Sequence, residues 1–146
     1  MSHRENVESV RNALDAFNAF ARGELEGLAV EEAAARISDP QIEWHWHNEL
    51  ATFGVPQHLR GVPEIIEGWE RFSRPWADLA LEALEFIEAP DDRVVTAMRQ
   101  SGRERESGVS MEIHFFDVWT IRDGKVRKLE IFRHRADALE AAGLPE

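Results

Sequence analysis

Apolar residues in the first part of the chain recur at the three- and four-residue spacing of amphipathic helices. The first helix begins at Ser2 and Glu5, which have the spacing of a capping box, and it ends near Gly23. Its apolar face consists of Val7, Val10, Leu14, Phe17, Phe20 and Ala21. Residues 25–37 are rich in alanine, glutamate and leucine, which favour helix, so they predict a second helix.

A short strand, a loop and a third helix follow. Aromatic residues alternate over residues 41–47, which is typical of a strand. Residues 48–61 contain glycine and proline without a clear period and are predicted to form a loop. Pro63 suits the first turn of a helix that ends at Arg74 and Pro75. The buried face of this helix consists of Ile65, Ile66, Trp69 and Phe72.

The second half of the chain predicts strands. The clearest segments are residues 94–100, 111–121 and 125–132. Asp123 and Gly124 separate the last two segments and are a strong hairpin signal. Residues 79–89 are ambiguous, because their glutamate and alanine content is helical whereas their larger apolar residues alternate.

The remaining segments are a turn region and a closing helix. Residues 101–108 are polar and charged, and they predict a solvated connection. Residues 136–142 predict a short helix, and Gly143 and Leu144 fit the two positions after its end in a Schellman cap. Helices therefore come first, with one strand between them, and an antiparallel sheet follows. This order predicts an α+β fold in which helices pack on one face of a curved sheet.

Size and composition indicate one globular domain over residues 1–146. The chain has 146 residues and 43% hydrophobic residues, which is enough for a hydrophobic core. Its net charge of −11 argues against nucleic-acid binding, which needs clustered cations, and against anionic membrane surfaces. The absence of cysteine excludes disulfides and thiolate chemistry. The chain shows no signal peptide and no apolar run of membrane-spanning length, so we expect a cytoplasmic protein.

The segment 113–121 carries the most informative polar residue. One face of this predicted strand presents Ile113, Phe115, Asp117, Trp119 and Ile121. An ionised carboxylate is costly to bury in such a row unless it is paired, and an unpaired one tends to be protonated. Asp117 is therefore either a general acid or hydrogen-bond donor in a pocket, or a structural carboxylate that is satisfied by its surroundings.

Two arginines are the candidate partners of Asp117. Arg99 lies in the middle of a predicted strand and could counter Asp117 or bind a ligand carboxylate. Arg133 follows the last predicted strand and could do the same. A buried pair of this kind would be chemically silent. We therefore assign Asp117 and Arg99 as the candidate catalytic residues and keep the structural pairing as the alternative.

Aromatic residues predict the walls of a ligand pocket. Five tryptophans are many for this length, and tryptophan often lines ligand-filled cavities. The predicted ligand-binding residues are Phe17, Trp44, Trp46, Trp69, Phe115, Trp119, Leu129 and Arg133. Core packing is the alternative for each of them taken singly. The ligand expected in such a pocket is a small apolar molecule.

Histidines alternate with the tryptophans in the strand 41–47. Alternation places Trp44 and Trp46 on one face and Glu43, His45 and His47 on the other. Two imidazoles spaced in this way could bind one metal with the glutamate as a third ligand. Because no cysteine or third histidine is fixed nearby in the sequence, we assign no metal site. We also expect no cofactor, since no glycine-rich phosphate-binding turn precedes a helix.

Three segments together resemble a known superfamily. They are Leu-Arg-Gly-Val-Pro-Glu-Ile-Ile-Glu-Gly-Trp (59–69), Val-Trp-Thr-Ile-Arg-Asp-Gly-Lys-Val (118–126) with the closing 136–144, and the opening helix that ends in Ala-Arg-Gly-Glu (21–24). In these the chain resembles the SnoaL-like branch of the nuclear transport factor 2-like superfamily. The resemblance implies a cone, in which a strongly bent antiparallel sheet wraps around N-terminal helices and leaves an apolar pocket. It does not choose among cyclases, isomerases, hydrolases and non-catalytic binding domains.

A comparison of single residues with the family shortens the list of possible activities. Asp117 falls where the isomerases carry a pocket Asp that donates to the substrate oxyanion, a carboxyl kept neutral by its apolar site. The isomerase base would fall near Trp44, and the phenolic donor is missing because the chain has no tyrosine. The acid on the final strand of the epoxide hydrolases would fall at Ile131. The resemblance therefore leaves two hypotheses, a cofactor-free cyclase, isomerase or hydratase that uses Asp117, and a non-catalytic ligand-binding module.

A homodimer is expected through the outer face of the sheet. His114 and His134 are predicted on this face together with apolar residues, namely Phe116, Val118, Val126 and Phe132. Helices are expected to cover only the other face of the sheet. An exposed apolar sheet face favours association, so the sequence predicts a homodimer through Phe116, Val118 and Phe132.

Overall fold

The computed structural model describes residues 1–47 and 56–145, and within them it contains four helices and six strands. The helices are α1 (His3–Ala21), α2 (Leu28–Ile37), α3 (Gly61–Ser73) and α4 (Arg135–Ala141). The strands are β1 (Ser38–Trp46), β2 (His58–Arg60), β3 (Trp76–Ala89), β4 (Arg93–Glu104), β5 (Ser110–Arg122) and β6 (Lys125–Phe132). The six strands form a single sheet in the order β2-β1-β6-β5-β4-β3.

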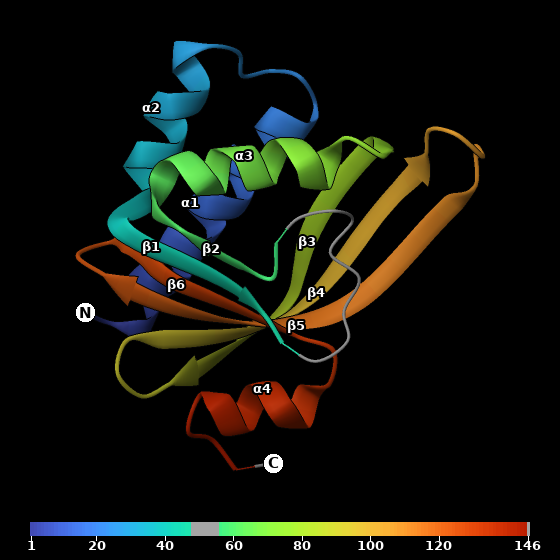
Figure 1. Ribbon diagram of the computed structural model, residues 1–146. Coiled ribbons are helices and arrows are strands. Elements are labelled where there is room, and N and C mark those ends of the chain that lie inside the picture. The colour runs from blue at the N-terminus through green and yellow to red at the C-terminus, as the bar shows by residue number, and fades with distance from the viewer. Residues whose placement is uncertain (48–55, 146) are drawn as a thin grey trace.

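The sheet is curved and carries helices on both faces. Helices α1, α2 and α3 lie over one face, whereas α4 lies below the other (Figure 1). All neighbouring strands are antiparallel except β1 and β6, which run parallel, so the sheet is mixed rather than wholly antiparallel. The register between β3 and β4 shifts at Ala77/Ala80 and at Ala83/Glu85. Such bulges increase the bend of a strand, which helps this edge of the sheet to wrap around the helices.

The four predicted helices are confirmed, although α2 begins at Leu28 and not at residue 25. The capping signals at the start of α1 and after α4 are confirmed as well. The backbone N–H of Glu5 donates to Ser2 Oγ at 3.1 Å and the backbone N–H of Ser2 donates to Glu5 Oε1 at 3.1 Å, which completes the capping box of α1. After α4, the N–H groups of Gly143 and Leu144 donate to the carbonyls of Glu140 and Leu139 at 3.0 and 2.8 Å. This pattern, with φ of 78° at Gly143, is the predicted Schellman cap.

Strands extend further than the sequence pattern indicates. The ambiguous segment 79–89 is part of β3, and the hairpin at Asp123 and Gly124 is confirmed, with φ of 52° and 77°. The charged segment 101–108 is only partly a connection, because β4 continues to Glu104. Its charged side chains do not oppose strand structure there, since they reach solvent while the backbone pairs with β5. The predicted loop 48–61 contains β2 at its end, and residues 48–55 lie outside the described residues.

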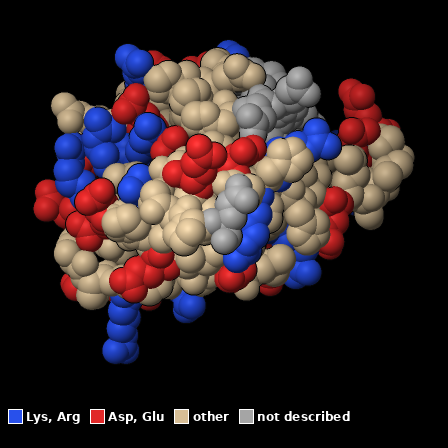
Figure 2. Space-filling model, turned by 90° about the horizontal axis from the view of Figure 1, so that it is seen from below, with Lys and Arg blue, Asp and Glu red and all other residues tan. Residues whose placement is uncertain are grey.

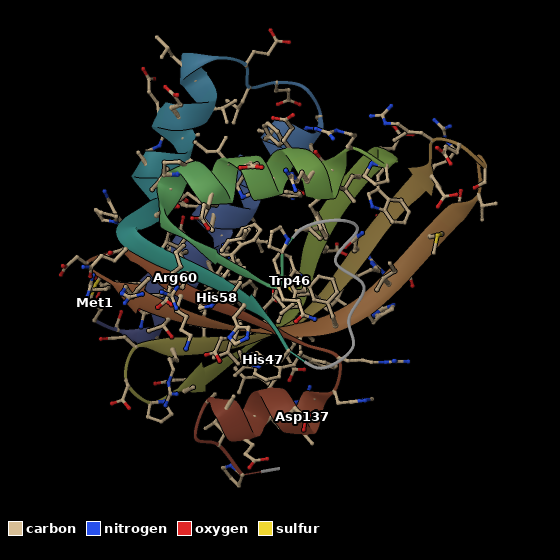
Figure 3. All side chains as sticks on the ribbon, viewed as in Figure 1. Met1, Trp46, His47, His58, Arg60 and Asp137 are labelled. Carbon is tan, nitrogen blue, oxygen red and sulfur yellow. The ribbon has the colours of Figure 1, made fainter. Side chains whose placement is uncertain are left out.

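Two hydrophobic cores lie on opposite sides of the sheet. The larger core joins α1, α2 and α3 to the concave face, whereas the smaller one joins α4 to the opposite face. Neighbouring residues at the end of β1 point to opposite faces of the sheet. Trp46 lies on the side of the larger core, and His47 lies on the side of α4 (Figure 3). In the described residues, no helix combines the length and the apolar character that a membrane crossing requires.

The prediction that helices cover only one face of the sheet is wrong. Val118 is fully buried and Phe132 is buried by packing against Ala138 and Leu139 of α4 in the same chain. Phe116 packs at the margin of this core and stays partly exposed. Side chains of both charges are interspersed over the face that is seen from the side of α4 (Figure 2). The homodimer stays a prediction, and Val118 and Phe132 are not free to form its interface.

A bidentate ion pair ties the start of β1 to the end of β5. Arg122 donates from Nε to Asp39 Oδ2 at 2.9 Å and from Nη2 to Asp39 Oδ1 at 2.8 Å. The backbone N–H of Gln41 also donates to Asp39 Oδ1, at 2.8 Å. These bonds, the one from Arg122 foremost, hold the pKa of Asp39 below its ordinary value. The pair therefore fixes β1 beside the β5–β6 hairpin.

Replacing Asp39 with asparagine is expected to lower the free energy of unfolding by about 1–2 kcal/mol at neutral pH, a value reduced because Arg122 is half exposed. Because the folded-state pKa is depressed, this stabilisation is present above the unfolded-state pKa and is lost as the pH falls through the folded-state value. Urea unfolding at neutral and acidic pH measures it. Asp15→Asn, at an exposed position of α1, is the control, and an equal loss in both variants would contradict the ion pair's role.

Candidate functional site

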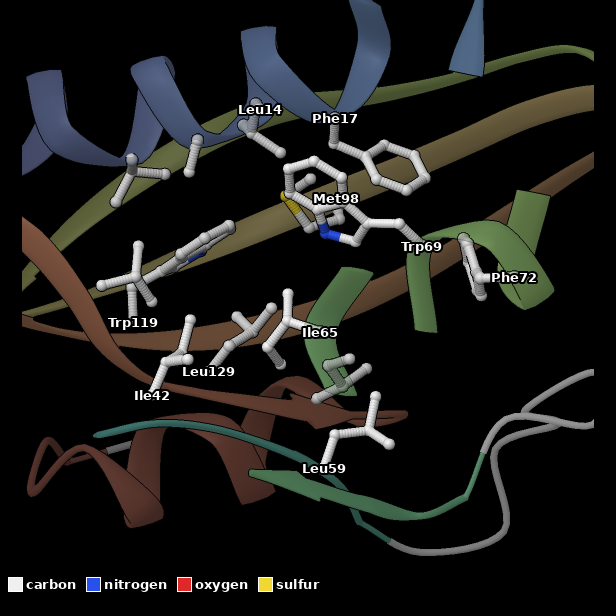
Figure 4. Close-up of a cluster of buried hydrophobic side chains, with 14 of the residues drawn as sticks. Leu14, Phe17, Ile42, Leu59, Ile65, Trp69, Phe72, Met98, Trp119 and Leu129 are labelled. Carbon is white, nitrogen blue, oxygen red and sulfur yellow. The ribbon is translucent and has the colours of Figure 1, made fainter. Parts of the chain in front are cut away.

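An apolar cavity lies between the concave face of the sheet and the helices above it. Its volume is about 120 Å³. Figure 4 shows Phe17 of α1 and Trp69 of α3 over Trp119 and Leu129 of the sheet. The cavity is therefore built from elements far apart in the sequence, and its walls are largely aromatic and aliphatic.

Seven of the eight predicted ligand-binding residues line this cavity. They are Phe17, Trp44, Trp46, Trp69, Phe115, Trp119 and Leu129. The cross-strand register explains why the sheet residues meet, because Trp44 pairs with Leu129, and Leu129 pairs with Trp119. Period-two alternation then turns all three side chains toward the helices. Whether they bind a ligand stays a prediction.

Asp117 lies in the floor of the cavity among apolar side chains. Its register neighbours are Thr96 on β4 and Ile131 on β6, and Ile131 in turn pairs with Trp46. The side chain is 3% exposed, and Oδ1 has no hydrogen-bond partner in the part of the chain that the structure describes. Burial raises the pKa of the Asp117 carboxyl well above its ordinary value. The carboxyl is thus favoured in its neutral form, which can donate a hydrogen bond.

Trp119 is held in place by a buried hydrogen bond. Its indole N–H donates to Thr96 Oγ1 at 2.9 Å. Thr96 is the residue directly across from Asp117, so the hydroxyl beside the carboxyl already accepts from the indole. This bond fixes the plane of the Trp119 ring next to Asp117. The ring therefore forms a rigid wall of the cavity.

Three further polar atoms face the cavity without a partner among the described residues. They are Gln100 Nε2, Ser38 Oγ and Trp69 Nε1, and all three residues are at least nine-tenths buried. The sequence pattern does not point to Gln100 or Ser38 as site residues. The available signal for Gln100 was its place on the same face of β4 as Val94 and Met98, where a polar residue stands out. Buried polar atoms are nearly always hydrogen-bonded, so these atoms indicate where a ligand or water would bind.

The assignment of Arg99 to the site is wrong. Arg99 lies on the opposite face of β4, half exposed, and pairs with Glu82 of β3. The register pairs Asp117 with Thr96, so the residues of β4 that share the cavity face are Thr96, Met98 and Gln100. An odd-numbered residue of β4 therefore points away from the cavity. The Arg99 guanidinium therefore faces Glu82 and not Asp117.

The assignment of Arg133 to the site is also wrong. Arg133 follows the last residue of β6, is exposed and does not line the cavity. The alternative in which Asp117 is silenced by a buried pair with Arg99 or Arg133 therefore fails as well. Burial is the cause of the raised pKa of Asp117. What remains of the predicted catalytic pair is Asp117 alone.

The histidines of β1 lie outside the cavity in a stack of rings. The ring centroids of His45 and His47 are 4.1 Å apart, those of His45 and His58 are 4.9 Å apart, and His47 stacks on Phe132 at 4.4 Å. Glu130 contacts His47 at 3.1 Å. Burial, with the neighbouring imidazoles, lowers the pKa of His45. No group of three or more metal-ligating side chains in the described residues is arranged to hold a metal ion.

A bent sheet around helices with an apolar cavity between them defines the cone-shaped α+β class of nuclear transport factor 2-like and ketosteroid isomerase-like domains. The chain belongs to the SnoaL-like domain family, whose model matches residues 10–129. None of the curated proteins matches the chain. The resemblance inferred from the sequence is therefore confirmed at the level of family and fold.

Solved structures of the same fold cover almost the whole chain. A nuclear transport factor 2-like protein of unknown function from Burkholderia pseudomallei is 21% identical, with a TM-score of 0.68 over 97% of this chain and 98% of that one. TerC, co-crystallized with polyporic acid, is 22% identical, with a TM-score of 0.68 over 94% and 97%. A candidate SnoaL-like polyketide cyclase from Jannaschia is 17% identical, with a TM-score of 0.69 over 98% and 94%. At these identities the likeness shows the fold alone.

Proposed function

We propose that this protein binds a small, mostly apolar carbonyl compound in the cavity, with the neutral carboxyl of Asp117 donating a hydrogen bond to the carbonyl oxygen. The observation that carries the proposal is the buried Oδ1 of Asp117, which faces the cavity without a partner among the described residues. A neutral acid in an apolar site is a hydrogen-bond donor. A carbonyl oxygen is the complementary acceptor that also tolerates apolar walls.

The geometry supports a role in which Asp117 binds and polarises the carbonyl group of the ligand. It gives less support to a complete proton-transfer reaction. A donor aimed at a carbonyl oxygen stabilises negative charge that develops there, as cyclases and isomerases require. Among the described lining residues, however, the other polar side chains are a serine hydroxyl, a glutamine amide and indoles, none of which is a base at neutral pH. Catalysis would therefore need Asp117 both to give and to take the proton. A cofactor-free cyclase-like or isomerase-like activity is the second candidate, favoured by Asp117 itself.

The relatives support a ligand-binding cavity. TerC, which shares the fold, has been co-crystallized with polyporic acid. A second structure of the fold is a candidate polyketide cyclase, and a third is a candidate isomerase from Rhodopseudomonas palustris with a TM-score of 0.70. These names are consistent with an organic ligand for a protein of this fold. The chemical class proposed for this chain comes from its own cavity.

Titration with 2-acetylnaphthalene tests the proposal. The probe has an aromatic body and one carbonyl, and tryptophan fluorescence reports its binding because four tryptophans line the cavity. Asp117→Leu is expected to weaken binding by roughly 3- to 10-fold, the value of one lost hydrogen bond, whereas Asp117→Asn keeps a donor and loses less. Arg99→Met, on the opposite face, is the control and is expected to bind like the wild type.

Two outcomes would overturn the proposal. One is the absence of saturable binding to the wild-type protein, and the other is equal affinity in the wild type and Asp117→Leu. Exchange of the methyl protons of the probe in deuterated water separates the two candidate functions. Exchange that depends on Asp117 supports proton transfer, whereas binding without exchange supports a binding module.

A further inference from the structure

Gln100 is one of the cavity residues, besides Asp117, with a polar atom that has no partner among the described residues. It lies on β4, is 4% exposed and lines the cavity, and its Nε2 has no hydrogen-bond partner in the described residues. Leaving a buried amide unpaired costs free energy that a structural role would not explain. A ligand or a water molecule in the cavity is therefore expected to supply the missing hydrogen-bond partner of this amide.

The register places Gln100 and Asp117 at different points along the cavity floor. Gln100 pairs with Ile113, which lies four residues before Asp117 on β5. A strand rises about 3.3 Å per residue, so the two rows are roughly 13 Å apart along the sheet. Both side chains line the same cavity, so one ligand of sufficient length could contact both. Phe115 and Met98 form the row between them and are apolar.

The residues around these two points select the shape and charge of a ligand. Trp119, Trp69 and Phe17 provide flat walls on the sheet side and on the helix side. None of the described lining residues is lysine, arginine or histidine. Asp117 favours its neutral form and Gln100 carries no charge, so neutral oxygen groups fit both points better than carboxylates or phosphates do.

We propose that the natural ligand is an elongated, flat, neutral molecule with an oxygen function near each end, one bound by Asp117 and the other by Gln100. This rests on the proposed function, because it assigns the carbonyl to Asp117. The Nε2 group of Gln100 donates, so it accommodates the oxygen of a hydroxyl or of a second carbonyl. Gln100 is thus a specificity-determining residue that selects for the far end of the ligand.

A matched pair of probes tests this assignment. 6-Hydroxy-2-acetylnaphthalene and 6-methyl-2-acetylnaphthalene have the same body and carbonyl and differ only in the polarity of the far end. The preference is the ratio of their dissociation constants, measured by tryptophan fluorescence. The preference for the hydroxyl probe is expected to be roughly 3- to 10-fold larger in the wild-type protein than in Gln100→Leu. This difference corresponds to one hydrogen bond. Gln100→Leu is expected to bind the methyl probe at least as well as the wild type.

The outcomes separate this inference from the proposed function. If the wild type binds both probes and Gln100→Leu has the same preference, the role of Gln100 is wrong and the proposed function stands. If the wild type binds neither probe, both fail. If Gln100→Leu does not fold, Gln100→Met replaces it. The wild-type protein alone also gives a test. Burying one methyl group favours the methyl probe by roughly 4-fold, so a wild-type preference of this size for the methyl probe would contradict the role of Gln100.

Discussion

Replacing Trp69 with alanine is expected to lower the free energy of unfolding by about 3–5 kcal/mol, because it deletes a large buried ring next to an existing cavity. Trp69 is 1% exposed. Its ring contacts Phe17 edge to face, with centroids 5.9 Å apart, and Phe20 at 5.6 Å. The substitution removes both of these contacts between α3 and α1, whereas the contact between Phe72 and Phe17 remains. Equilibrium unfolding in urea measures the loss.

The matched controls for Trp69 are one conservative and one exposed substitution. Trp69→Phe keeps an aromatic ring and is expected to lose less than half as much stability. Leu84→Ala, at a side chain that is 49% exposed, is expected to change the free energy of unfolding by less than about 0.5 kcal/mol. A loss below about 1 kcal/mol in Trp69→Ala would show that the helices do not depend on this ring.

Replacing Asp117 with asparagine is expected to raise the melting temperature near pH 8 and to change it little near pH 4. The pKa of Asp117 is raised in the folded state by burial. Between the unfolded-state pKa, about 3.9, and the raised folded-state value, the folded protein therefore binds more protons than the unfolded chain. Stability consequently falls as the pH rises through this window. Asparagine cannot ionise, so it removes this loss.

Thermal unfolding of both proteins across the pH range measures the effect. Asp39 contributes with the opposite sign, since its pKa is lowered and its stabilisation is lost at acidic pH, but this contribution is the same in both proteins and cancels in the difference. Asp15→Asn on the exposed face of α1 is the control. A difference in melting temperature that is equal at both pH values would contradict a raised pKa of the buried Asp117 carboxyl.

The sequence was sufficient for features that depend on local periodicity. Alternation along 113–121 placed Asp117 on the same face as Phe115 and Trp119, and the structure has this arrangement. Capping signals at Ser2 and Gly143 located helix ends because those signals are read from neighbouring residues. The family resemblance supplied the bent sheet, which no local pattern encodes.

The errors lie where one strand must be aligned with another. Arg99 and Gln100 are adjacent, and choosing between them requires the pairing of Thr96 with Asp117, which the sequence of β4 alone does not contain. The same limit applies to α4. Its residues predict a short helix, but only the fold shows that Ala138 and Leu139 cover Val118. Charged residues at 101–104 likewise suggested a turn although the backbone pairs as strand.

The packing of both faces of β5 has a consequence for the acid that it carries. Val118 is wedged under α4 while Asp117, its immediate neighbour, faces the cavity. A slip of one residue would bury the carboxyl beneath α4 and push a valine into the cavity, so the register is strongly specified. Packing on both faces of β5 therefore fixes the position of the Asp117 carboxyl without any ligand. Leu139 of α4 packs in the core beneath β5 and does not line the cavity. Substitutions at Leu139 are therefore expected to change the affinity for a cavity ligand by shifting the position of β5.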